Sequence, residues 1–249
     1  MNAPLSAPRA KPAVHEAEPA YVLHTYPFKE TSLIVEAFTC AHGRVPLVAK
    51  GARRPKSALR GLLMPFQPVL LWWSGRAELR LLHRAEWLAG HPQLSGMPLI
   101  CAFYLNELLL KLTARDDAHE GLFAGYEAAL VALRNQEPPA AVLRRFEKRL
   151  LAEIGYALLL ERDSQGSAID PLARYTYLPE RGPVAVSGAD LERAPVAVSG
   201  RTLLDMAQED YASPQTVAES RALMRHILSH QLAGQELYTR QLLREMQQL

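Results

Sequence analysis

The chain has 249 residues, of which 49% are hydrophobic and 22% are charged. This composition is typical of a globular protein and excludes a disordered or collagen-like chain, and the length allows one large domain or two ordinary ones. Its apolar stretches are far shorter than the roughly 18–20 residues that cross a bilayer. Residues 1–19 lack the apolar core of a secretory signal, and two cysteines are too few for a four-cysteine zinc site. We therefore expect a soluble, cytoplasmic protein with a flexible N-terminal tail at residues 1–19.

The net charge of +2 is distributed unevenly along the chain. Residues 1–90 hold 12 Lys or Arg against 6 Asp or Glu, whereas the remainder holds 16 against 20. Between Gly43 and Gly61 there is no acidic residue but six basic ones, Arg44, Lys50, Arg53, Arg54, Lys56 and Arg60. Because such crowded cations repel one another unless an anion is near, this segment predicts a surface that binds phosphates.

Five segments after the tail are rich in β-branched and aromatic residues and are separated by short turns. They are residues 20–28, 31–39, 45–49, 66–73 and 78–85. Strands of this number and length favour a small antiparallel barrel. We expect residues 20–90 to form a partly open, five-stranded barrel of the oligonucleotide-binding (OB) type.

The pattern changes to helical periodicity after residue 90. The predicted helices are 98–113, 120–133 and 140–153, then one from Ser213 or Ser220 to about 232, and a last one at 237–246. Residues 161–200 are rich in Gly, Pro and Ser and resist a helical prediction. The predicted fold class is therefore α+β: the barrel, then a mainly helical domain at 91–249 with an irregular or β insertion at 161–200.

The insertion contains the sequence Pro-Val-Ala-Val-Ser-Gly twice, at residues 183–188 and 195–200. Two copies are too few for a solenoid, which needs about three repeats to bury a continuous core. We interpret them as two short strands or a small local duplication.

The sequence holds none of the common catalytic or nucleotide-binding motifs, such as GxxxxGK[ST], GxGxxG, HExxH or GxSxG. Its densest polar cluster is Asp116, Asp117, His119 and Glu120. A solvated turn between helices explains this cluster better than a metal site, because no second ligand group lies at helical spacing. We expect no catalytic residue, metal or cofactor; a zinc-dependent hydrolase built on this cluster would need stoichiometric metal.

Aromatic residues accompany the basic segment in the predicted barrel: Tyr26, Phe28, Phe38, Trp72 and Trp73. Grooves that bind single-stranded nucleic acid combine cations along the backbone with aromatic rings that stack on bases. We expect most of these rings to fill the barrel and the others to face solvent. Arg80 and Arg84, on the last predicted strand, complete the set of DNA-binding candidates.

A second candidate site lies on the predicted helix 140–153. Arg144 and Arg145 stand beside Leu143, Phe146 and Leu150. A cationic pair at the rim of an apolar groove suits an acidic peptide that ends in a hydrophobic residue and a carboxylate. The alternative is a solvated helix face on which Arg145 or Lys148 pairs with Glu147.

Several motifs in series resemble the RecO family of bacterial recombination mediators. They are Ala-Tyr-Val-Leu-His-Thr-Tyr-Pro-Phe-Lys-Glu-Thr-Ser-Leu-Ile-Val at 20–35, Gly-Arg-Val-Pro-Leu-Val-Ala-Lys-Gly-Ala-Arg at 43–53, Leu-Leu-Met-Pro-Phe at 62–66, Tyr-Leu-Asn-Glu-Leu-Leu at 104–109, Leu-Arg-Arg-Phe-Glu at 143–147, Gly-Tyr at 155–156 and Leu-Ala-Gly-Gln-Glu-Leu at 232–237. The ordered series covers nearly the whole chain after the tail.

The resemblance implies a DNA repair and recombination protein that is not an enzyme, with an N-terminal OB domain and a C-terminal helical domain. Such proteins bind single- and double-stranded DNA, anneal complementary strands, work with RecR to load the RecA recombinase, and contact the acidic C-terminal tail of the single-stranded-DNA-binding protein. Their basic segment corresponds here to Arg44, Lys50, Arg53, Lys56 and Arg60, and their Leu-Arg-Arg-Phe-Glu helix to Arg144 and Arg145.

One departure concerns zinc. Many members carry a four-cysteine zinc module where this chain has residues 161–200, which contain no cysteine. Zinc is therefore not expected, and the duplicated segment would form a short structural hairpin instead. The remaining alternative for function is a non-catalytic adaptor whose basic barrel binds an acidic protein partner.

Overall fold

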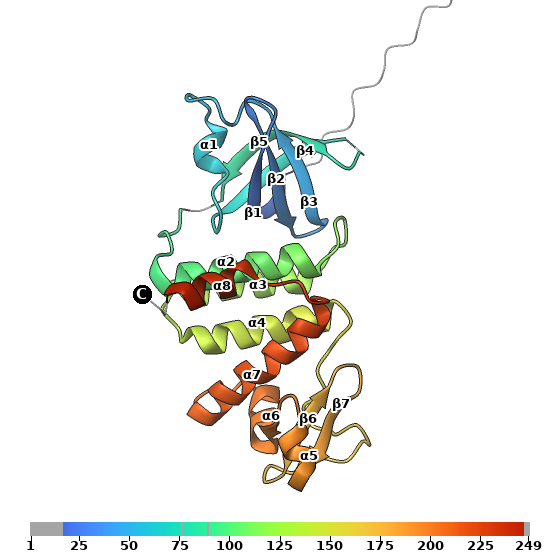
Figure 1. Cartoon of the computed structure of the whole chain (residues 1–249). Helices are drawn as coiled ribbons and strands as arrows, with labels where there is room; N and C mark the ends of the chain where they lie inside the picture. The colour runs from blue at the N-terminus through green and yellow to red at the C-terminus, as the bar shows by residue number, and fades with distance from the viewer. Residues whose placement is uncertain (1–16, 76, 89, 247–249) are drawn as a thin grey trace, which may run out of the picture. The chain divides into compact units, whose positions relative to one another are not determined.

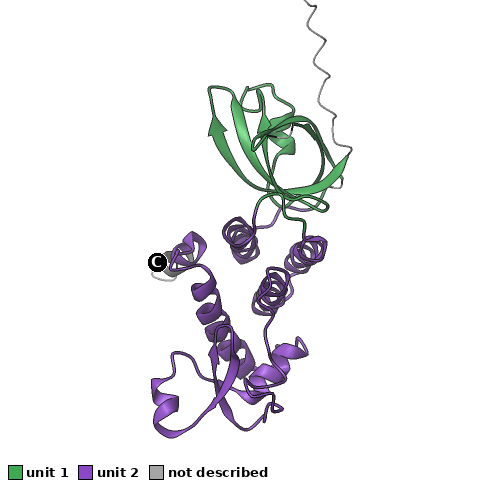
Figure 2. Ribbon diagram, turned by 90° about the vertical axis from the view of Figure 1, so that its right-hand side faces the viewer, with its two compact units in different colours: residues 1–91, 115–118 green, residues 92–114, 119–249 purple. Residues whose placement is uncertain are grey.

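The computed structural model describes residues 17–75, 77–88 and 90–246, with the backbone alone for 243–246. The described chain divides into two compact units, coloured separately in Figure 2. Unit 1 comprises the chain up to His91 together with residues 115–118, and unit 2 comprises residues 92–114 and the chain from His119 onward. Most of the predicted N-terminal tail, residues 1–16, lies outside the described residues.

Unit 1 is a β-barrel (Figure 1). Its elements are β1 (Glu18–Phe28), β2 (Ser32–Thr39), β3 (Gly43–Ala49), α1 (Leu59–Leu62), β4 (Pro68–Ser74) and β5 (Arg80–Trp87). The strand order is β1-β2-β3-β5-β4, and antiparallel pairing of β1 with β4 closes the barrel. The prediction of a five-stranded N-terminal barrel is confirmed, but the barrel is closed rather than partly open.

Alternate residues of the strands fill the barrel, as the period of two in a β-strand requires. The buried residues include Val35 and Ala37 of β2, Leu47 of β3, and Leu71 and Trp73 of β4, all fully shielded from solvent. Tyr26 of β1 and Arg84 of β5 are exposed, whereas Glu36 and Phe38, which alternate with the core residues of β2, are buried as well.

Residues 115–118, which we call the strap, lie between two helices of unit 2 in the sequence but belong to the barrel. β5 pairs with β3 at Leu47 and Val48. The strap pairs with β3 nearer the start of that strand, where the Asp116 amide donates to the Arg44 carbonyl at 3.0 Å. The Arg115 guanidinium forms ion pairs with the buried Glu36 carboxylate of β2 and with an exposed glutamate. The strap therefore supplies the cation that a buried barrel carboxylate requires.

Unit 2 is mainly helical. Its helices are α2 (Gly96–Leu112), α3 (Glu120–Arg134), α4 (Pro139–Glu153), α5 (Gly188–Arg193), α6 (Gly200–Ala207), α7 (Pro214–Gln231) and α8 (Tyr238–Met246). Helices α2, α3 and α4 pack on one another, α7 packs on α4, and α8 lies along α2. The helical prediction for this region is confirmed, and of the two candidate N-caps it is Ser213 that accepts a hydrogen bond from the Thr216 amide. No helix in the described part of the chain is both long and apolar enough to cross a membrane.

The insertion is a three-stranded sheet made of β6 (Arg174–Leu178), β7 (Gly182–Val186) and β8 (Val198–Ser199), in the order β7-β6-β8. The first copy of the duplicated sequence forms β7 and the second forms β8, so that Tyr175 of β6 pairs with Ala185 on one side and with Val198 on the other. The interpretation of the two copies as short strands is confirmed. They do not pair with each other, because each copy pairs with β6, which lies between them.

Glu219 of α7 holds this sheet to the helices. Its carboxylate accepts hydrogen bonds from the Ser199 amide (2.7 Å), the Thr202 hydroxyl (2.7 Å) and the Arg174 guanidinium (2.6 Å). Burial alone would raise the pKa of Glu219, but these donors lower it to about 2. A charged hydrogen-bond acceptor thus links strands and helices in a region without cysteine.

Candidate functional site

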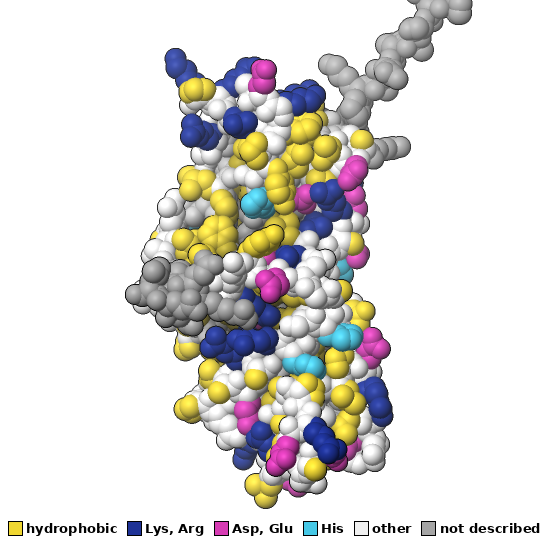
Figure 3. Space-filling model, viewed as in Figure 1, with side chains coloured by type: hydrophobic (Ala, Val, Ile, Leu, Met, Phe, Trp, Pro, Cys, Tyr) yellow, Lys and Arg dark blue, Asp and Glu magenta, His cyan; other side chains and the backbone are white. Residues whose placement is uncertain are grey.

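Five of the predicted DNA-binding cations lie together at one end of β3. We call residues 50–60 the basic loop; its cations are Lys50, Arg53, Arg54, Lys56 and Arg60. All five are exposed, and none forms an ion pair with a carboxylate of the described chain. Lys and Arg side chains gather over α1 and the adjoining loop in Figure 3. This end of the barrel is therefore a cationic surface, and no acid in the described part of the chain neutralises its charge by an ion pair.

The shape of the basic loop depends on Arg53. Its amide donates to the Thr31 carbonyl at 2.9 Å, and its guanidinium donates to the carbonyls of Lys29 and Glu30 at 3.5 and 3.3 Å. The loop is thereby tied to the turn between β1 and β2. The same bonds bring Lys29, an exposed cation that the sequence analysis missed, beside the loop; its position in a turn next to Glu30 gave no signal of this proximity.

Arg84 of β5 lies toward the same end of the barrel. β5 runs parallel to β3, and Arg80 is paired with Leu47. Arg84, four residues after Arg80, therefore lies near the level of residue 51, at the start of the basic loop. The Arg84 guanidinium stands 4.7 Å from the centroid of the Trp72 ring, which is a cation–π contact, and it also pairs with Glu86. Arg84 is thus a partly neutralised cation beside an aromatic ring.

Arg44 and Arg80 occupy a different environment. Arg44 precedes Lys50 by six residues of extended strand, which separates their Cα atoms by about 20 Å. It is half-buried, and burial lowers the pKa of its guanidinium while Glu36 raises it. The Arg80 guanidinium forms an ion pair of 2.7 Å with Asp116 of the strap. The eight predicted cations therefore do not form one surface: six lie toward the basic loop, and Arg44 and Arg80 belong to the acid-rich strap region.

The aromatic residues are less buried than expected. Phe38 and Trp73 are fully buried, whereas Tyr26 is 45% exposed and Phe28 and Trp72 are partly exposed. Three of the five rings therefore present surface to solvent on the barrel.

The polar cluster of the sequence is divided between the two units. Asp116 pairs with Arg80, whereas His119 lies 3.6 Å from the Glu153 carboxylate of α4. Among the described residues, no group of three or more His, Cys, Asp or Glu side chains could hold a metal ion. The structure thus gives Asp116 and His119 different partners, in different units, and the described residues of the cluster have no common centre.

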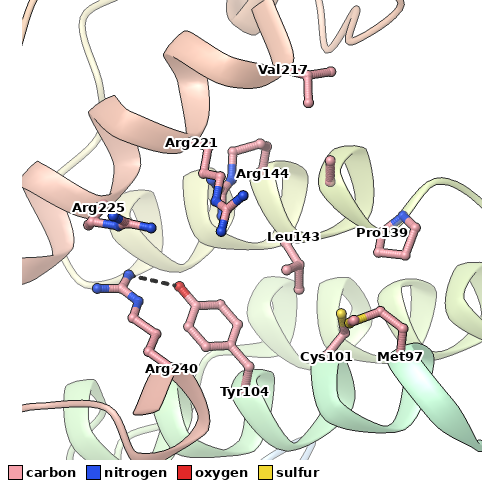
Figure 4. Close-up of a pocket in the computed structure, with 11 residues that line it drawn as sticks. Met97, Cys101, Tyr104, Pro139, Leu143, Arg144, Val217, Arg221, Arg225 and Arg240 are labelled. Atoms are coloured by element: carbon pink, nitrogen blue, oxygen red, sulfur yellow. Dashed lines mark hydrogen bonds between the residues drawn. The ribbon is translucent and has the colours of Figure 1, made fainter. Parts of the chain in front are cut away.

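Unit 2 contains a cavity of about 270 Å³ bordered by α2, α4, α7 and α8, which we call the arginine pocket. Figure 4 shows arginine side chains on one side of it and apolar side chains on the other. The arginines are Arg144, Arg221, Arg225 and Arg240, and the apolar residues include Met97, Cys101, Pro139 and Leu143. Burial raises the pKa of the Cys101 thiol, so this side of the pocket is uncharged.

Arg144 is the only member of the predicted cationic pair that lines this pocket. It is 8% exposed and forms an ion pair with Glu147, whose carboxylate is fully buried and also accepts a hydrogen bond of 2.7 Å from the Tyr104 hydroxyl. The charge of Arg144 is therefore balanced within the protein. Its Nε atom is buried and has no hydrogen-bond partner in the described chain, which leaves one donor for an entering acceptor.

Arg145 follows Arg144 directly and so projects about 100° around the helix from it. Its guanidinium lies in a separate groove on α3 and α4, where it pairs with Glu137 at 3.1 Å and lies 4.0 Å from Glu209. The structure thus separates the two arginines. The sequence analysis missed Arg221, Arg225 and Arg240, although the spacing of the first two by four residues places them on one face of a helix.

Comparison with known proteins agrees with this architecture. Residues 15–91 match the family model described as "Recombination protein O N terminal", and residues 97–241 match "Recombination protein O C terminal". The chain is thus a two-part recombination protein with a barrel followed by a helical region. A protein of Nitrosospira multiformis named "DNA repair protein RecO" is 56% identical over 235 residues, which cover 94% of this chain and 97% of the relative.

Two further relatives bear the same name. The protein of Aromatoleum aromaticum is 52% identical and that of Dechloromonas aromatica 50% identical, each over 94% of this chain and 97% of the relative. The chain belongs to the RecO family of DNA repair proteins, as the sequence motifs predicted.

Proposed function

We propose that the protein binds single- and double-stranded DNA through the basic loop and acts in homologous recombination as a non-catalytic mediator. The observation that supports this is the set of five exposed cations with no carboxylate partner in the described chain. The phosphates of a DNA backbone would supply the missing anions, and the exposed ring of Tyr26 and the partly exposed ring of Trp72 would stack on unpaired bases. Arg44 and Arg80 take no part in this proposal, because strap and barrel acids already surround them.

Annealing is the activity that such a surface favours. Two DNA strands repel each other as polyanions, and cations that contact only phosphates lower this repulsion while the base edges stay free to pair. With RecR as a partner, the protein would then help to load RecA on the strands, in the cytoplasm at the nucleoid. No metal, cofactor or catalytic step enters this proposal.

The test is fluorescence anisotropy of a labelled single strand at several salt concentrations. The variant combines Lys50→Ala, Lys56→Ala and Arg60→Ala; the control combines Arg181→Ala, Arg193→Ala and Arg201→Ala, three exposed arginines of unit 2, and so has the same net charge. Each phosphate contact to a single strand contributes about −0.7 to the slope of log affinity against log salt. We expect the basic-loop variant to reduce the slope by about 2 in magnitude and the control variant to leave it unchanged.

Equal slopes for the two variants would show that net charge, and not the basic loop, determines binding. An absence of DNA binding by the unmodified protein at low salt would favour the adaptor, whose barrel binds an acidic protein instead.

We further propose that the arginine pocket binds the acidic C-terminal tail of the single-stranded-DNA-binding protein. An apolar side with an arginine-rich side suits a peptide that ends in a hydrophobic residue and a carboxylate. Because Glu147 balances Arg144, the positive charge offered to the peptide comes chiefly from Arg221 and Arg240.

A labelled synthetic peptide of acidic residues ending in phenylalanine tests this second proposal. Arg221→Ala should weaken its binding about tenfold, whereas Arg145→Ala, which removes the same charge outside the pocket, should leave it unchanged. A loss of the same size in both variants would point to net charge rather than to the pocket.

A further inference from the structure

Helix α8 is held in place by a carboxylate from another helix. Glu107 of α2 accepts hydrogen bonds from the Tyr238 amide (2.8 Å), the Thr239 amide (3.0 Å) and the Thr239 hydroxyl (2.7 Å). The first amides of a helix have no acceptor within the helix, and a negative charge at that end is favourable. Glu107 thus caps α8 from α2, 131 residues earlier in the chain.

A second contact supports the same attachment. Lys111, one helical turn after Glu107 on α2, donates a hydrogen bond of 2.8 Å to the Glu236 carbonyl just before α8, and its ammonium lies 5.4 Å from the centroid of the Tyr238 ring. Glu236, which lies just before α8, and Tyr238, its first residue, are therefore both bonded to the same face of α2.

This attachment determines where Arg240 lies. Arg240 is in the first turn of α8, and its guanidinium donates a hydrogen bond of 3.2 Å to the Tyr104 hydroxyl and lies 5.7 Å from the centroid of that ring. Tyr104 precedes Glu107 by three residues on α2, so the two side chains share one helix face. The same face of α2 thus caps α8 and receives the arginine that α8 brings to the pocket.

Arg240 and Arg144 differ in the type of partner that each guanidinium has. Arg144 is balanced by the buried Glu147, whereas the hydrogen-bond partner of Arg240 is a phenol. Burial, followed by the nearby Glu147, raises the pKa of Tyr104, which keeps its hydroxyl neutral. Among the described residues, no carboxylate forms an ion pair with Arg240, so its positive charge is available to a ligand of the arginine pocket.

We propose that Arg240 is a specificity-determining residue for the terminal carboxylate or acidic side chains of the bound peptide, and that Glu107 is the residue that positions it by capping α8. This inference rests on the proposed peptide binding. Glu107 does not line the pocket, so its effect on binding passes through the placement of α8.

A double-mutant cycle tests the proposal, with the same labelled acidic peptide ending in phenylalanine as the probe. The variants are Arg240→Ala, Glu107→Gln and the two combined; Glu192→Gln, an exposed glutamate of α5, is the matched control. We expect about tenfold weaker binding for Arg240→Ala and about fivefold for Glu107→Gln. The combined variant should bind no more weakly than Arg240→Ala alone, because Glu107 acts through Arg240.

Losses that multiply in the combined variant would overturn the positioning role, since Glu107 would then act independently of Arg240. Unchanged binding in Glu107→Gln would overturn it as well. If the unmodified protein does not bind the peptide at all, the proposed peptide function fails together with this inference, whereas binding with multiplied losses removes only the inference. Thermal unfolding of each variant separates a loss of binding from a loss of fold.

Discussion

Arg174 of β6 donates a hydrogen bond of 2.6 Å to Glu219 of α7, 45 residues later in the chain. The same carboxylate accepts from Ser199 and Thr202, so a single side chain holds the start of α6, the central strand of the insertion and α7 together. This region contains no cysteine, and an anion surrounded by hydrogen-bond donors connects its strands and helices.

Replacing Glu219 by Gln should lower the free energy of unfolding by about 1–2 kcal/mol at pH 7, because the hydrogen bonds to a charged acceptor are weakened. The pKa of about 2 lies below the ordinary value of 4.5, so the stabilisation is complete above pH 4.5 and is lost as the pH falls toward 2. Urea unfolding between pH 7 and pH 3 should show the difference between the two proteins shrinking with acid. A difference independent of pH would mean that the charge of Glu219 is unimportant.

Replacing Arg115 by Ala should destabilise the protein by about 2–3 kcal/mol, because it leaves the Glu36 carboxylate, which is 3% exposed, without its closest cation. Adding Glu36→Gln to that variant should recover most of the lost free energy of unfolding. Glu78, the other partner of Arg115, is 82% exposed, and its replacement by Gln should cost no more than about 0.5 kcal/mol. Urea unfolding measures the free energy of unfolding of all three variants. If Glu36→Gln does not recover the stability lost in Arg115→Ala, Arg115 acts by packing alone.

Replacing Gly43 by Ala should destabilise the barrel by more than about 2 kcal/mol. Gly43 has a φ of +63°, and a Cβ atom there would lie 1.8 Å from the Asp117 carbonyl oxygen of the strap. Gly61 of α1 is the matched control, because nothing lies within 4 Å of a Cβ at that position and Ala favours a helix. Gly61→Ala should be neutral or stabilising by up to about 1 kcal/mol, and comparable thermal shifts for both variants would contradict the close approach of the strap.

Replacing Arg53 by Ala should weaken single-strand binding about tenfold, and Lys56→Ala about threefold. Both remove one cation, so the salt slopes should change equally, by about 0.7. Arg53→Ala also removes the two side-chain hydrogen bonds that hold the basic loop to the β1–β2 turn and leaves only the Arg53 amide bond to Thr31, so its affinity should be lower at every salt concentration. Anisotropy titrations distinguish the two effects, and identical affinities would show that the bonds to Lys29 and Glu30 do not organise the surface.

The barrel and the long helices could be predicted from the sequence because their signals are local. Alternation with a period of two and helical spacing depend on neighbours within a few residues, and β5 and α4 began and ended within about two residues of the predicted bounds. The short α6 was missed, because its capping depends on Ser199 and on Glu219, 20 residues later. The pairing of β6 with both copies of the duplicated sequence is likewise a contact between distant segments.

In the candidate site, too, only the features that depend on residues close together in the sequence could be predicted. The cations of residues 50–60 are contiguous in the sequence and proved to be contiguous in space. Arg44 was grouped with them because it is close along the chain, yet an extended strand carries it about 20 Å away. There its acidic neighbour is Glu36 of β2. Arg240 could not be assigned to a site, because its position depends on a cap given by Glu107 across 131 residues.

The strap also determines how this protein can be divided. The N-terminal family match ends at residue 91, yet the barrel includes Arg115 from beyond that boundary. A fragment ending at residue 91 would retain Glu36 and lose its cation, and would expose the β3 backbone that Asp116 covers. Residues 17–91 therefore do not contain the whole barrel unit. A chimaera that exchanges barrels between relatives must transfer residues 115–118 together with the strands. Substitutions at Glu36 and Arg115 are expected to occur together.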